Sequence, residues 1–377
     1  MIFQAKTMFS VLKAYFFKKD SPCIANWIIT SQCNCKCPFC ELGIENKYNP
    51  KEELSTKRCF EIIKEMKKMG IKVVTISGGE SFLRKDIYLI LEELNKNGIK
   101  IGIVTNGLLL NSLTQEKINL LKKYLDTLVI SLDSPLAKEH NKFRRTPRLF
   151  ELIMKGIDKL HDNGFWNITF ESIIMGENYK RIPELIKLTK EKKIRRIMFR
   201  PINIISNFPQ LSPLNNKNEF ANYNVEDIIK YINFGIKEAK KLKVNTDLMF
   251  NKKWIIEYFK NLKAKKGFFH DKVMSNYFCF IPFLYVIINY NGDLLPCLLL
   301  EGKGNVRNKS LIEERKKANN IRKHLAKRKF YGVCNCCFDQ ANNNVRFSSL
   351  CSPIRNYKAL PALMYDIKSV VKRYTLK

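Results

Sequence analysis

The sequence lacks an uninterrupted apolar run long enough to cross a membrane, and it lacks a recognisable signal peptide. Its longest apolar stretch, around residues 280–300, is broken by polar residues and a glycine between 289 and 293. The chain has twelve cysteines but, at 377 residues, is far longer than a small disulfide-bonded secreted domain. These absences predict a protein of the reducing cytoplasm, which would meet a membrane only at the inner face, as a peripheral protein.

Acidic residues are scarce. Asp and Glu together number 35 against 67 Lys and Arg, so the formal net charge is +32. Such an excess attracts anionic partners such as nucleic acid, acidic phospholipid or phosphorylated compounds. Arginines do not interleave with aromatic residues and no nucleic-acid module is visible, so nucleic acid is not an expected partner. The lysines fall mostly on the polar faces of expected helices, where they are simply solvated.

Three cysteines, Cys33, Cys37 and Cys40, are spaced as CxxxCxxC directly after an apolar run. Three thiolates fill three corners of a 4Fe–4S cluster and leave one iron open, whereas an electron-transfer cluster takes four cysteines. Zinc would want a fourth Cys or His ligand, and none follows within the next eighteen residues. The spacing therefore predicts a cluster with a free coordination position. Cys35 fits no ligand scheme as well, and we interpret it as a bystander.

Short apolar runs alternate with amphipathic helical stretches from residue 25 to about 203. Most of the runs are rich in Ile and Val, as strands covered on both faces are. The helix over 55–69 ends at Gly70, and Pro183 fits the first turn of the helix after the fifth strand. This order predicts an α/β fold, a partial (β/α)6 barrel of the TIM type with a parallel sheet. The six expected strands are 25–30, 72–77, 100–105, 127–132, 167–174 and 196–202.

Polar residues follow the ends of successive expected strands. The first strand runs into the cysteine loop, and the next three end in Ser-Gly-Gly-Glu (77–80), Thr-Asn-Gly (105–107) and Ser-Leu-Asp (131–133). Sites of parallel α/β folds form at the carboxyl ends of the strands. The two glycines would let a backbone edge approach a ligand closely, and Glu80 would accept a hydrogen bond from an ammonium group.

The cysteine loop and the Gly-Gly-Glu element together resemble the radical S-adenosylmethionine (radical SAM) superfamily. The resemblance implies that the open iron chelates the amino and carboxylate groups of S-adenosylmethionine. It also implies that the residue before the last cysteine packs beside the adenine and that Gly-Gly-Glu binds the methionine amino group. Ser81 stands where the family usually has proline. The implied cofactor-binding positions are Phe39, Gly78, Gly79, Glu80, Asn106, Ser131 and Asp133.

Arg144 and Glu171 are the catalytic candidates. Arg144 resembles an arginine that follows the fourth strand in relatives with extra clusters, and the alternative is a cation in a surface loop. Glu171 lies on the fifth expected strand, where it would face the barrel interior. A structural ion pair is an equally good interpretation of Glu171.

Four further cysteines form a second candidate metal site. Cys279 and Cys297 bracket an expected β-hairpin with a tight Asn-Gly turn at 291–292. Cys334 and Cys337 form a CxxC pair after a helical stretch. Four thiolates suit either zinc or a 4Fe–4S cluster, so the residues alone leave the metal open.

The spacing of this second set resembles the twitch appendage of radical SAM enzymes, a shortened SPASM domain that binds one auxiliary cluster. A full SPASM domain needs the series CxxCxxxxxCxxxC, and Asn343 stands where its third cysteine would fall. Cys336 and Cys351 are weaker ligand candidates. The expected fold is therefore the barrel followed by a small β-hairpin and helix cluster-binding domain.

Both ends of the chain are basic and amphipathic. On one face of a helix lie Met8, Phe9, Leu12, Tyr15 and Phe16, with lysines around it. Such a helix either lies on an anionic membrane surface or caps one end of the barrel, and we favour the cap. The tail from residue 357 has a similar pattern, and two such ends raise the expectation of a lipid-like substrate.

The expected organisation has five parts: an N-terminal amphipathic helix (1–20), the radical SAM barrel (21–205), a helical connector (206–274), the twitch domain (275–340) and a basic tail (341–377). The resemblance implies two 4Fe–4S clusters, S-adenosylmethionine and a reductant such as ferredoxin or flavodoxin. The expected activity is reductive cleavage of S-adenosylmethionine to a 5′-deoxyadenosyl radical that abstracts hydrogen from a substrate. The auxiliary cluster would take part in substrate oxidation or bond formation.

The substrate stays open among phosphate-bearing, lipid-like and peptide compounds. No peptide-recognition domain precedes the expected barrel, which weakens the peptide option. A different class of function is a non-catalytic metal- or cluster-binding module with a redox-sensing or nucleic-acid-associated role. That alternative leaves unexplained why polar motifs fall at successive strand ends.

Overall fold

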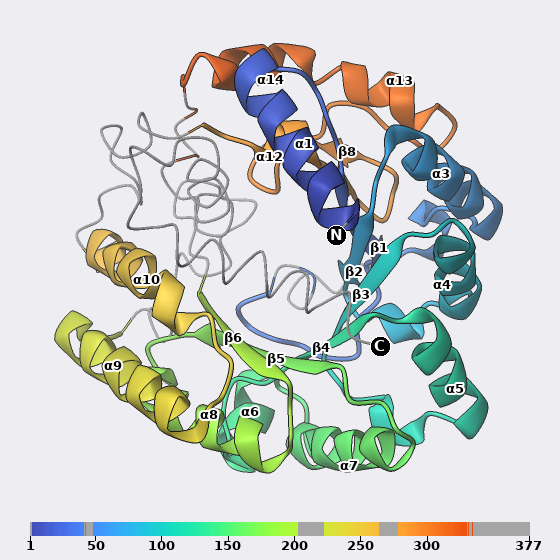
Figure 1. Cartoon of the computed structure of the whole chain (residues 1–377). Helices are drawn as coiled ribbons and strands as arrows, with labels where there is room; N and C mark the ends of the chain where they lie inside the picture. Colours follow the sequence, from blue (N-terminus) through green and yellow to red (C-terminus); the bar gives the residue numbers. More distant parts are fainter. Residues whose placement is uncertain are drawn as a thin grey trace.

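The computed structural model describes residues 2–40, 42, 48–202, 222–263, 278–329, 331 and 334. Its strands lie inside an arc of helices (Figure 1). The strands are β1 (Ile24–Thr30), β2 (Val73–Gly78), β3 (Lys100–Thr105), β4 (Thr127–Ser131), β5 (Ile168–Ile174), β6 (Arg196–Pro201), β7 (Tyr285–Ile288) and β8 (Leu294–Leu295). The α-helices are α1 (Ile2–Phe17), α3 (Thr56–Met69), α4 (Ile87–Lys96), α5 (Gln115–Tyr124), α6 (Ala137–Phe143), α7 (Leu149–Asp162), α8 (Ile182–Glu191), α9 (Val225–Leu242), α10 (Leu248–Lys263), α12 (Ile281–Leu284), α13 (Leu311–Lys316) and α14 (Asn319–Ala326). Short 3-10 turns are η1 (Pro50–Glu52), η2 (Ser81–Leu83), η3 (Leu110–Ser112) and η4 (Tyr179–Arg181).

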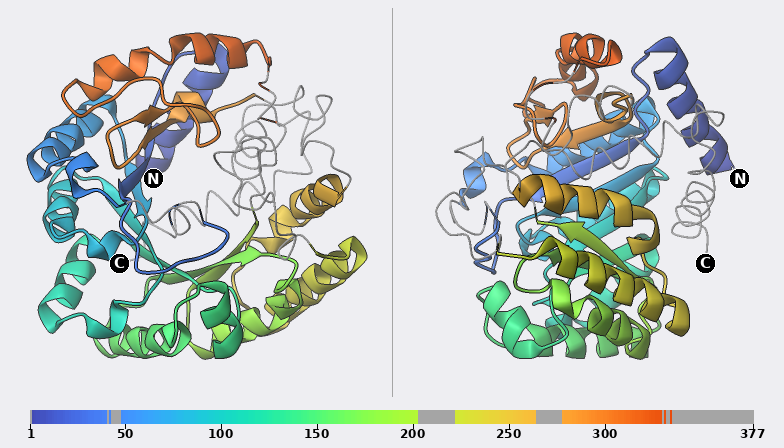
Figure 2. Two further views of the ribbon diagram at one scale, coloured as in Figure 1. Left: turned by 180° about the vertical axis from the view of Figure 1, so that it is seen from behind. Right: turned by 90° about the vertical axis from the view of Figure 1, so that its left-hand side faces the viewer.

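One sheet of eight strands runs through the molecule in the order β6-β5-β4-β3-β2-β1-β7-β8. Strands β1 to β7 are parallel, and β8 pairs antiparallel with β7. Figure 2 shows the sheet curving inside the helices from two further directions. The six expected strands are all present, and the expected α/β fold of the partial TIM-barrel kind is confirmed.

The strand β7 is an addition to that expectation. The expected hairpin is formed by β7 and β8, but β7 also pairs with β1, with Ile24 opposite Tyr285 and Trp27 opposite Ile288. The C-terminal part of the chain therefore supplies a strand to the barrel sheet itself.

Helices cover the outer face of the sheet because each carries an apolar side. Helix α3 begins after Ser55, whose side chain accepts a hydrogen bond from the Arg58 backbone N–H, and ends at Gly70 with φ of +89°. Pro183 lies in the first turn of α8, as the sequence predicted. Between helices and sheet lies the main core, which includes the fully buried Trp27, Ile76, Ile103, Ile130, Phe170 and Phe199.

Side chains alternate between the outer core and the barrel interior along each strand. Val104 pairs with Val129, and Ser131 pairs with Glu171, so these side chains share one face of the sheet. The opposite face carries Ile103, which is fully buried under the helices. Glu171 and Ser131 therefore face the interior of the barrel.

The C-terminal elements are fastened to the start of the chain. Arg315 on α13 forms a two-pronged ion pair with Asp20, at 2.7 and 2.8 Å. It also donates hydrogen bonds to the carbonyl oxygens of Tyr285 (2.7 Å) and Pro282 (3.0 Å). A buried charge held on all sides in this way fixes the relative position of its neighbours.

Helices α9 and α10 fall within the expected connector. The expected boundaries near residues 205, 274 and 340 lie outside the described residues, and so does the tail from residue 341. Within the described part of the chain, no helix combines the length and the apolar character needed to span a membrane.

Candidate active site

The cysteine loop follows the carboxyl end of β1 and meets the ends of two other strands. Cys33 and Cys40 are half-buried, and Cys37 is buried. Asn106 after β3 reaches toward Cys33, with 3.9 Å between Nδ2 and Sγ. Arg144 beyond β4 reaches toward Cys37, with 4.0 Å between Nη1 and Sγ. The structure thus gathers the expected ligands and two of the expected site residues at one edge of the sheet.

Cys35, the expected bystander, lies between two of the expected ligands. Its thiol donates toward Cys33 and Cys37, which lowers the pKa of Cys33 to about 6 and also lowers the pKa of Cys37. The same contacts raise the pKa of Cys35 itself. The backbone N–H of Cys35 points at the Cys33 sulfur from 3.4 Å. Because the thiolate is the form that binds metal, these contacts prepare Cys33 and Cys37 as ligands.

Gly78 and Gly79 let the end of β2 pack directly on the backbone of the cysteine loop. A Cβ on Gly79 would lie 2.1 Å from the Gln32 carbonyl oxygen, and a Cβ on Gly78 would lie 2.3 Å from that of Thr30. Gly78 also has φ of +141°, which other residues rarely adopt. We expected these glycines to open a path for a ligand. Their first role in the structure is the contact between two backbone segments.

Glu80 is fully buried, and both oxygens of its carboxylate accept hydrogen bonds from groups within the chain. It accepts hydrogen bonds from the Asn106 N–H (2.7 Å), the Phe82 N–H (3.1 Å) and the Thr105 hydroxyl (2.9 Å to each oxygen). Burial raises the pKa of Glu80 to about 7. In the structure Glu80 joins the end of β2 to the end of β3. The expected hydrogen bond from an ammonium group stays a prediction.

Asp133 and Arg144 form a buried ion pair beside the cysteine loop. Nε and Nη2 of Arg144 both lie 2.7 Å from Asp133 Oδ2. The other carboxylate oxygen accepts a hydrogen bond from the Ile173 N–H at 2.9 Å. Arg144 is only 8% exposed, so the alternative of a surface-loop cation is wrong. Both oxygens of Asp133 are engaged within the chain, and the expected contact of this side chain with the cofactor stays a prediction.

The Phe39 ring is held over this ion pair. Its centre lies 5.2 Å from the Arg144 guanidinium, a cation–π contact. The ring also packs against Phe143, Met175 and Ile202, which form a small apolar cluster near the ends of β5 and β6. Phe39 is thereby fixed at the same edge as the cysteines.

Glu171 lies in the barrel interior as expected, and it also makes the ion pair offered as the alternative. Its Oε1 is 3.4 Å from Nε of Arg200. Arg200 is shared with Asp247, whose Oδ2 lies 2.5 Å from Nη1. These three charges line the wall made by β5 and β6.

A cavity of about 310 Å³ lies on the other side of the interior, against β1, β2 and β3. Leu42 enters it from just beyond the cysteine loop, and Leu298 enters it from the position next to Cys297. One lining residue therefore comes from beside each set of candidate ligands in the sequence. The cavity is lined by Asn26, Ile28, Leu42, Thr75, Ser77, Gly78, Val104 and Leu298, none of which is charged.

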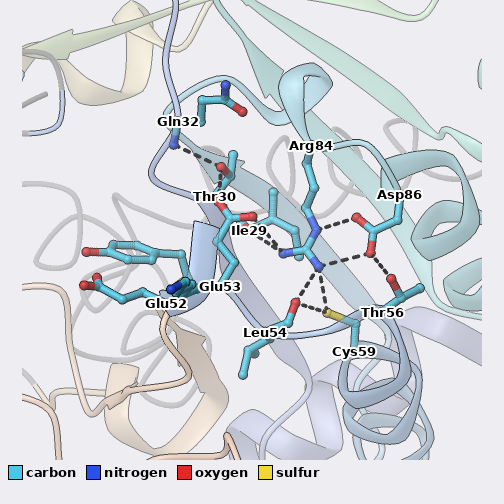
Figure 3. Close-up of polar contacts among 12 residues, drawn as sticks. Ile29, Thr30, Gln32, Glu52, Glu53, Leu54, Thr56, Cys59, Arg84 and Asp86 are labelled. Atoms are coloured by element: carbon cyan, nitrogen blue, oxygen red, sulfur yellow. Dashed lines mark hydrogen bonds and ion pairs between the residues drawn. The ribbon is translucent and has the colours of Figure 1, made fainter. Parts of the chain in front are cut away.

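Arg84, which the sequence analysis did not single out, is the centre of a buried network (Figure 3). Its guanidinium donates hydrogen bonds to the carbonyl oxygens of Ile29 (2.8 Å) and Leu54 (2.7 Å). It pairs with Asp86, with 2.7 Å from Nε to Oδ1, and lies 3.7 Å from Glu53. The network ties β1 to the segment that follows the cysteine loop.

That segment also supports the second candidate metal site. The Leu54 N–H donates to the Tyr290 carbonyl oxygen (3.2 Å), at the turn of the β7–β8 hairpin. Arg58 on α3 donates to the Val306 carbonyl oxygen from 2.6 Å. The segment after the cysteine loop and the start of α3 are therefore fastened to the C-terminal part of the chain at Tyr290 and Val306.

Three of the four expected ligands of the second site are described. Cys279 and Cys297 pack against one apolar cluster, which contains residues of α1 and α12. Burial raises the pKa of Cys297 to about 12, and the charge of neighbouring Cys334 adds to the effect. Three candidates lie outside the described residues: Cys336, Cys337 and Cys351.

The three thiols of the cysteine loop have the donor chemistry of an iron–sulfur cluster, whose ligands are cysteine thiolates. Cys33, Cys37 and Cys40 would hold one such cluster.

Two further residues have roles that the sequence did not predict, although Thr105 stands in the Thr-Asn-Gly motif. Thr105 donates to Glu80 as described, and the buried His140 accepts a hydrogen bond from the Asp133 N–H (3.2 Å). Burial lowers the pKa of His140 well below its usual value. Neither partner could be predicted from spacing, because each comes from a different segment.

The fold and the site define a partly closed parallel α/β barrel with cysteine sites of iron–sulfur type. Residues 27–189 match the family model of the Radical SAM superfamily, and residues 279–338 match that of the SPASM iron-sulfur cluster-binding domain. Residues 27–189 are therefore a radical SAM domain, and residues 279–338 are a SPASM-type domain near the C-terminus.

Among curated relatives, the chain is 28% identical over 172 residues to the AdoMet-dependent heme synthase of Methanosarcina barkeri (strain Fusaro / DSM 804). That match covers 46% of this chain and 48% of the relative. It is 27% identical over 279 residues to the probable GTP 3′,8-cyclase of Methanocaldococcus jannaschii, covering 72% of this chain and 83% of that relative. The chain spans about half the length of the curated relatives that it matches first.

Solved structures show the same fold. Streptococcus suis SuiB bound to its precursor peptide SuiA superposes with a TM-score of 0.61 at 21% identity, covering 88% of this chain and 74% of SuiB. The enzyme anSMEcpe with bound AdoMet and the Cp18Cys peptide superposes with a TM-score of 0.59 at 16% identity, covering 93% of this chain and all of the other. Both likenesses extend over the barrel and the C-terminal elements.

Proposed function

We propose that this chain is an enzyme that cleaves S-adenosylmethionine reductively at a 4Fe–4S cluster, giving a 5′-deoxyadenosyl radical that abstracts hydrogen from a substrate in the barrel. Cys33, Cys37 and Cys40 would hold the cluster. The observation that carries the proposal is the meeting of the cysteine loop with the ends of β2, β3 and β4. A metal-binding module without catalysis has no need of that convergence.

Some residues around the cysteine loop would contact the cofactor, and others hold the loop and the strand ends in place. We assign the cofactor contacts to Phe39, to the backbone at Gly78 and Gly79, and to Ser131, which faces the interior beside Glu171. Asn106 contacts both Cys33 and, at 2.7 Å, the side chain of Asn34. We assign Glu80, Asp133 and Arg144 to support, since their polar atoms are engaged within the chain. A site held this rigidly keeps the reacting atoms close and water out.

We place the reacting part of the substrate in the cavity against β1, β2 and β3. Its lining combines aliphatic side chains with the neutral polar groups of Asn26, Thr75 and Ser77. Several relatives are named GTP 3′,8-cyclases, and a triphosphate wants cationic partners. None of the described residues that line this cavity is a cation, and Arg200 on the far wall is shared by two carboxylates. The lining favours an uncharged, partly apolar substrate group over a phosphate.

At the far side of the cavity, Cys279, Cys297, Cys334 and Cys337 would hold an auxiliary 4Fe–4S cluster. Leu298 joins the cavity wall to Cys297, so an electron leaving the substrate there has a short path. Net oxidation or formation of a new bond would follow. A reductant such as ferredoxin or flavodoxin would supply the first electron, and such partners and clusters suit the reducing cytoplasm.

The test is anaerobic reconstitution with iron and sulfide, followed by reduction with S-adenosylmethionine and assay for 5′-deoxyadenosine. The matched control is the variant Cys33→Ala/Cys37→Ala/Cys40→Ala. We expect about eight irons per chain, about four in the control, and deoxyadenosine from the unmodified chain alone. Absence of deoxyadenosine from the fully loaded chain would overturn the proposal and favour the non-catalytic module.

A further inference from the structure

Helix α1 has two faces of opposite character. On the inner face, Val11 and Ala14 have no solvent exposure and pack in one apolar cluster with Phe280 and Phe283. Tyr15 stacks on the Phe280 ring, with 6.0 Å between the ring centres. This face packs α1 against α12 and the residues before it, and the cap on the barrel that we favoured from the sequence stays a prediction.

The outer face of α1 presents three aromatic side chains to solvent. Phe9, Phe16 and Phe17 are 65%, 60% and 69% exposed. They lie seven and eight residues apart along the helix, with Lys13 between them, and this spacing places all four on one side. The sequence pattern had grouped Phe9 and Phe16 with Tyr15, and the edge of the Phe16 ring does meet Tyr15, with 5.2 Å between the ring centres. Buried contacts with the barrel do not account for this face.

The charge around this face has one sign. Residues 1–19 contain four lysines and no Asp or Glu. The first acidic residue, Asp20, is held by Arg315 at 2.7 Å. With a net charge of +32 on the whole chain, the surface around α1 complements an anionic partner rather than a basic one.

We propose that the outer face of α1 docks on an anionic lipid surface, with Phe9, Phe16 and Phe17 at the boundary between headgroups and acyl chains. Aromatic side chains that stand out from a helix enter a deformable lipid layer, and lysines beside them meet the anionic headgroups. A protein partner would need a matching groove for three protruding rings. The helix would lie along the surface and would not cross it.

Vesicle co-sedimentation of the full chain tests this proposal. The probes are vesicles of phosphatidylcholine alone and vesicles with about 30% phosphatidylglycerol. We expect binding to the anionic vesicles, little binding to the neutral ones, and a clear loss of binding at about 0.5 M salt. No binding to the anionic vesicles at low salt would overturn the proposal.

The variant Phe9→Ser/Phe16→Ser/Phe17→Ser locates the surface. We expect the lipid concentration for half-maximal binding to rise about tenfold or more, since three apolar side chains no longer enter the layer. The matched control is Leu89→Ser/Phe234→Ser, which removes side chains that are 54% and 46% exposed on α4 and α9. Equal loss in both variants, or no loss in the first, would place lipid binding elsewhere and refute the proposal.

A charge variant separates lipid docking from a change in folding. Lys13→Glu/Lys19→Glu leaves the aromatic side chains in place, and both lysines belong to the acid-free segment. We expect anionic vesicle binding to weaken severalfold while the melting temperature and iron content stay unchanged. Unchanged vesicle binding in this variant would contradict the electrostatic half of the proposal. None of these measurements depends on the radical chemistry.

Discussion

Glu80 and Asp133 are carboxylates without solvent exposure, and each accepts hydrogen bonds from another strand end. Glu80 binds the backbone N–H of Asn106, and Asp133 binds that of Ile173. Removing one such acceptor leaves a buried donor without a partner, which typically costs about 1–3 kcal/mol. Single residues at this edge therefore control the spacing of whole strands.

The pH dependence of stability tests the environment of Glu80. Its pKa is about 7 in the folded chain, against an ordinary value of 4.5. Between these values the folded state holds a proton that the unfolded state releases, so stability falls as the pH rises from about 5 to 7. The contribution is on the order of 3 kcal/mol. Denaturant unfolding of the metal-free chain across this range should show the slope.

Glu80→Gln should remove this part of the slope, because the amide does not titrate. The exposed Glu313→Gln is the control and should leave the slope as it is. An equal slope in the unmodified chain and in Glu80→Gln would show that Glu80 is ionised in the folded state throughout this range.

Replacing Cys35 by serine should affect cluster binding less than replacing Cys33 does. We expect Cys35→Ser to keep the full iron content, because a serine hydroxyl can still donate toward Cys33 and Cys37. Cys33→Ser should lose about half of the iron, the share of the first cluster. Iron analysis and the spectrum of the reduced cluster check both. Loss of the first cluster in Cys35→Ser would make Cys35 a ligand.

At the scale of elements, the end of β2 packs so closely on the cysteine loop that a side chain does not fit at Gly79. In Gly79→Ala, the new Cβ would meet the Gln32 carbonyl at 2.1 Å, so the loop must move. We expect loss of S-adenosylmethionine binding, measured by equilibrium dialysis on the reconstituted chain. The control is Gly302→Ala, whose Cβ would have its nearest neighbour at 3.5 Å. Normal binding in Gly79→Ala would show that the loop tolerates displacement.

The Arg84 network joins β1, η1, η2 and α3 (Figure 3). Arg84→Met would leave the carboxylates of Asp86 and Glu53 without their cation and two carbonyl oxygens without donors. We expect a loss of about 3 kcal/mol in the free energy of unfolding, and slower cluster assembly. The control Arg181→Met removes an ion pair with the more exposed Glu139 and should cost much less. Similar losses in the two variants would refute a special role for Arg84.

At the scale of the whole molecule, Arg315 joins the start of the chain at Asp20 to the C-terminal elements. Arg315→Met would remove the close ion pair with Asp20 and the hydrogen bonds to the carbonyl oxygens of Tyr285 and Pro282 together, leaving Asp20 and Pro282 only their longer contacts with Arg322. We expect a loss of about 2–3 kcal/mol and faster hydrogen exchange in β7. Within the part of the chain that the structure describes, the adjacent Lys316 pairs with Glu313 alone, on the same exposed turn, so Lys316→Met should change neither measurement. Unaltered exchange in Arg315→Met would mean that β7 is held without this residue.

The sequence predicted the six barrel strands because each is a short apolar run followed by a helix of clear period. It did not predict that β7 joins β1, because a run of four residues before a tight turn looks the same in a free hairpin as in a sheet. It placed Glu80, Asp133 and Arg144 at the site, but it did not predict that their partners would be one another and the backbone. The sequence did not predict the role of Arg84, since the residues next to a buried arginine do not distinguish it from an exposed one.

The pairing of β1 with β7 has a consequence for the order of events during synthesis. A chain leaves the ribosome from its N-terminus, so β1 is made early and waits for its second neighbour until residue 288 has emerged. Until then one edge of β1 is open, and open strand edges invite wrong pairing. The turn at Tyr290, which supports the segment behind the cysteine loop, also arrives late. We therefore expect the loop to be ready for its cofactor only once most of the chain has been released.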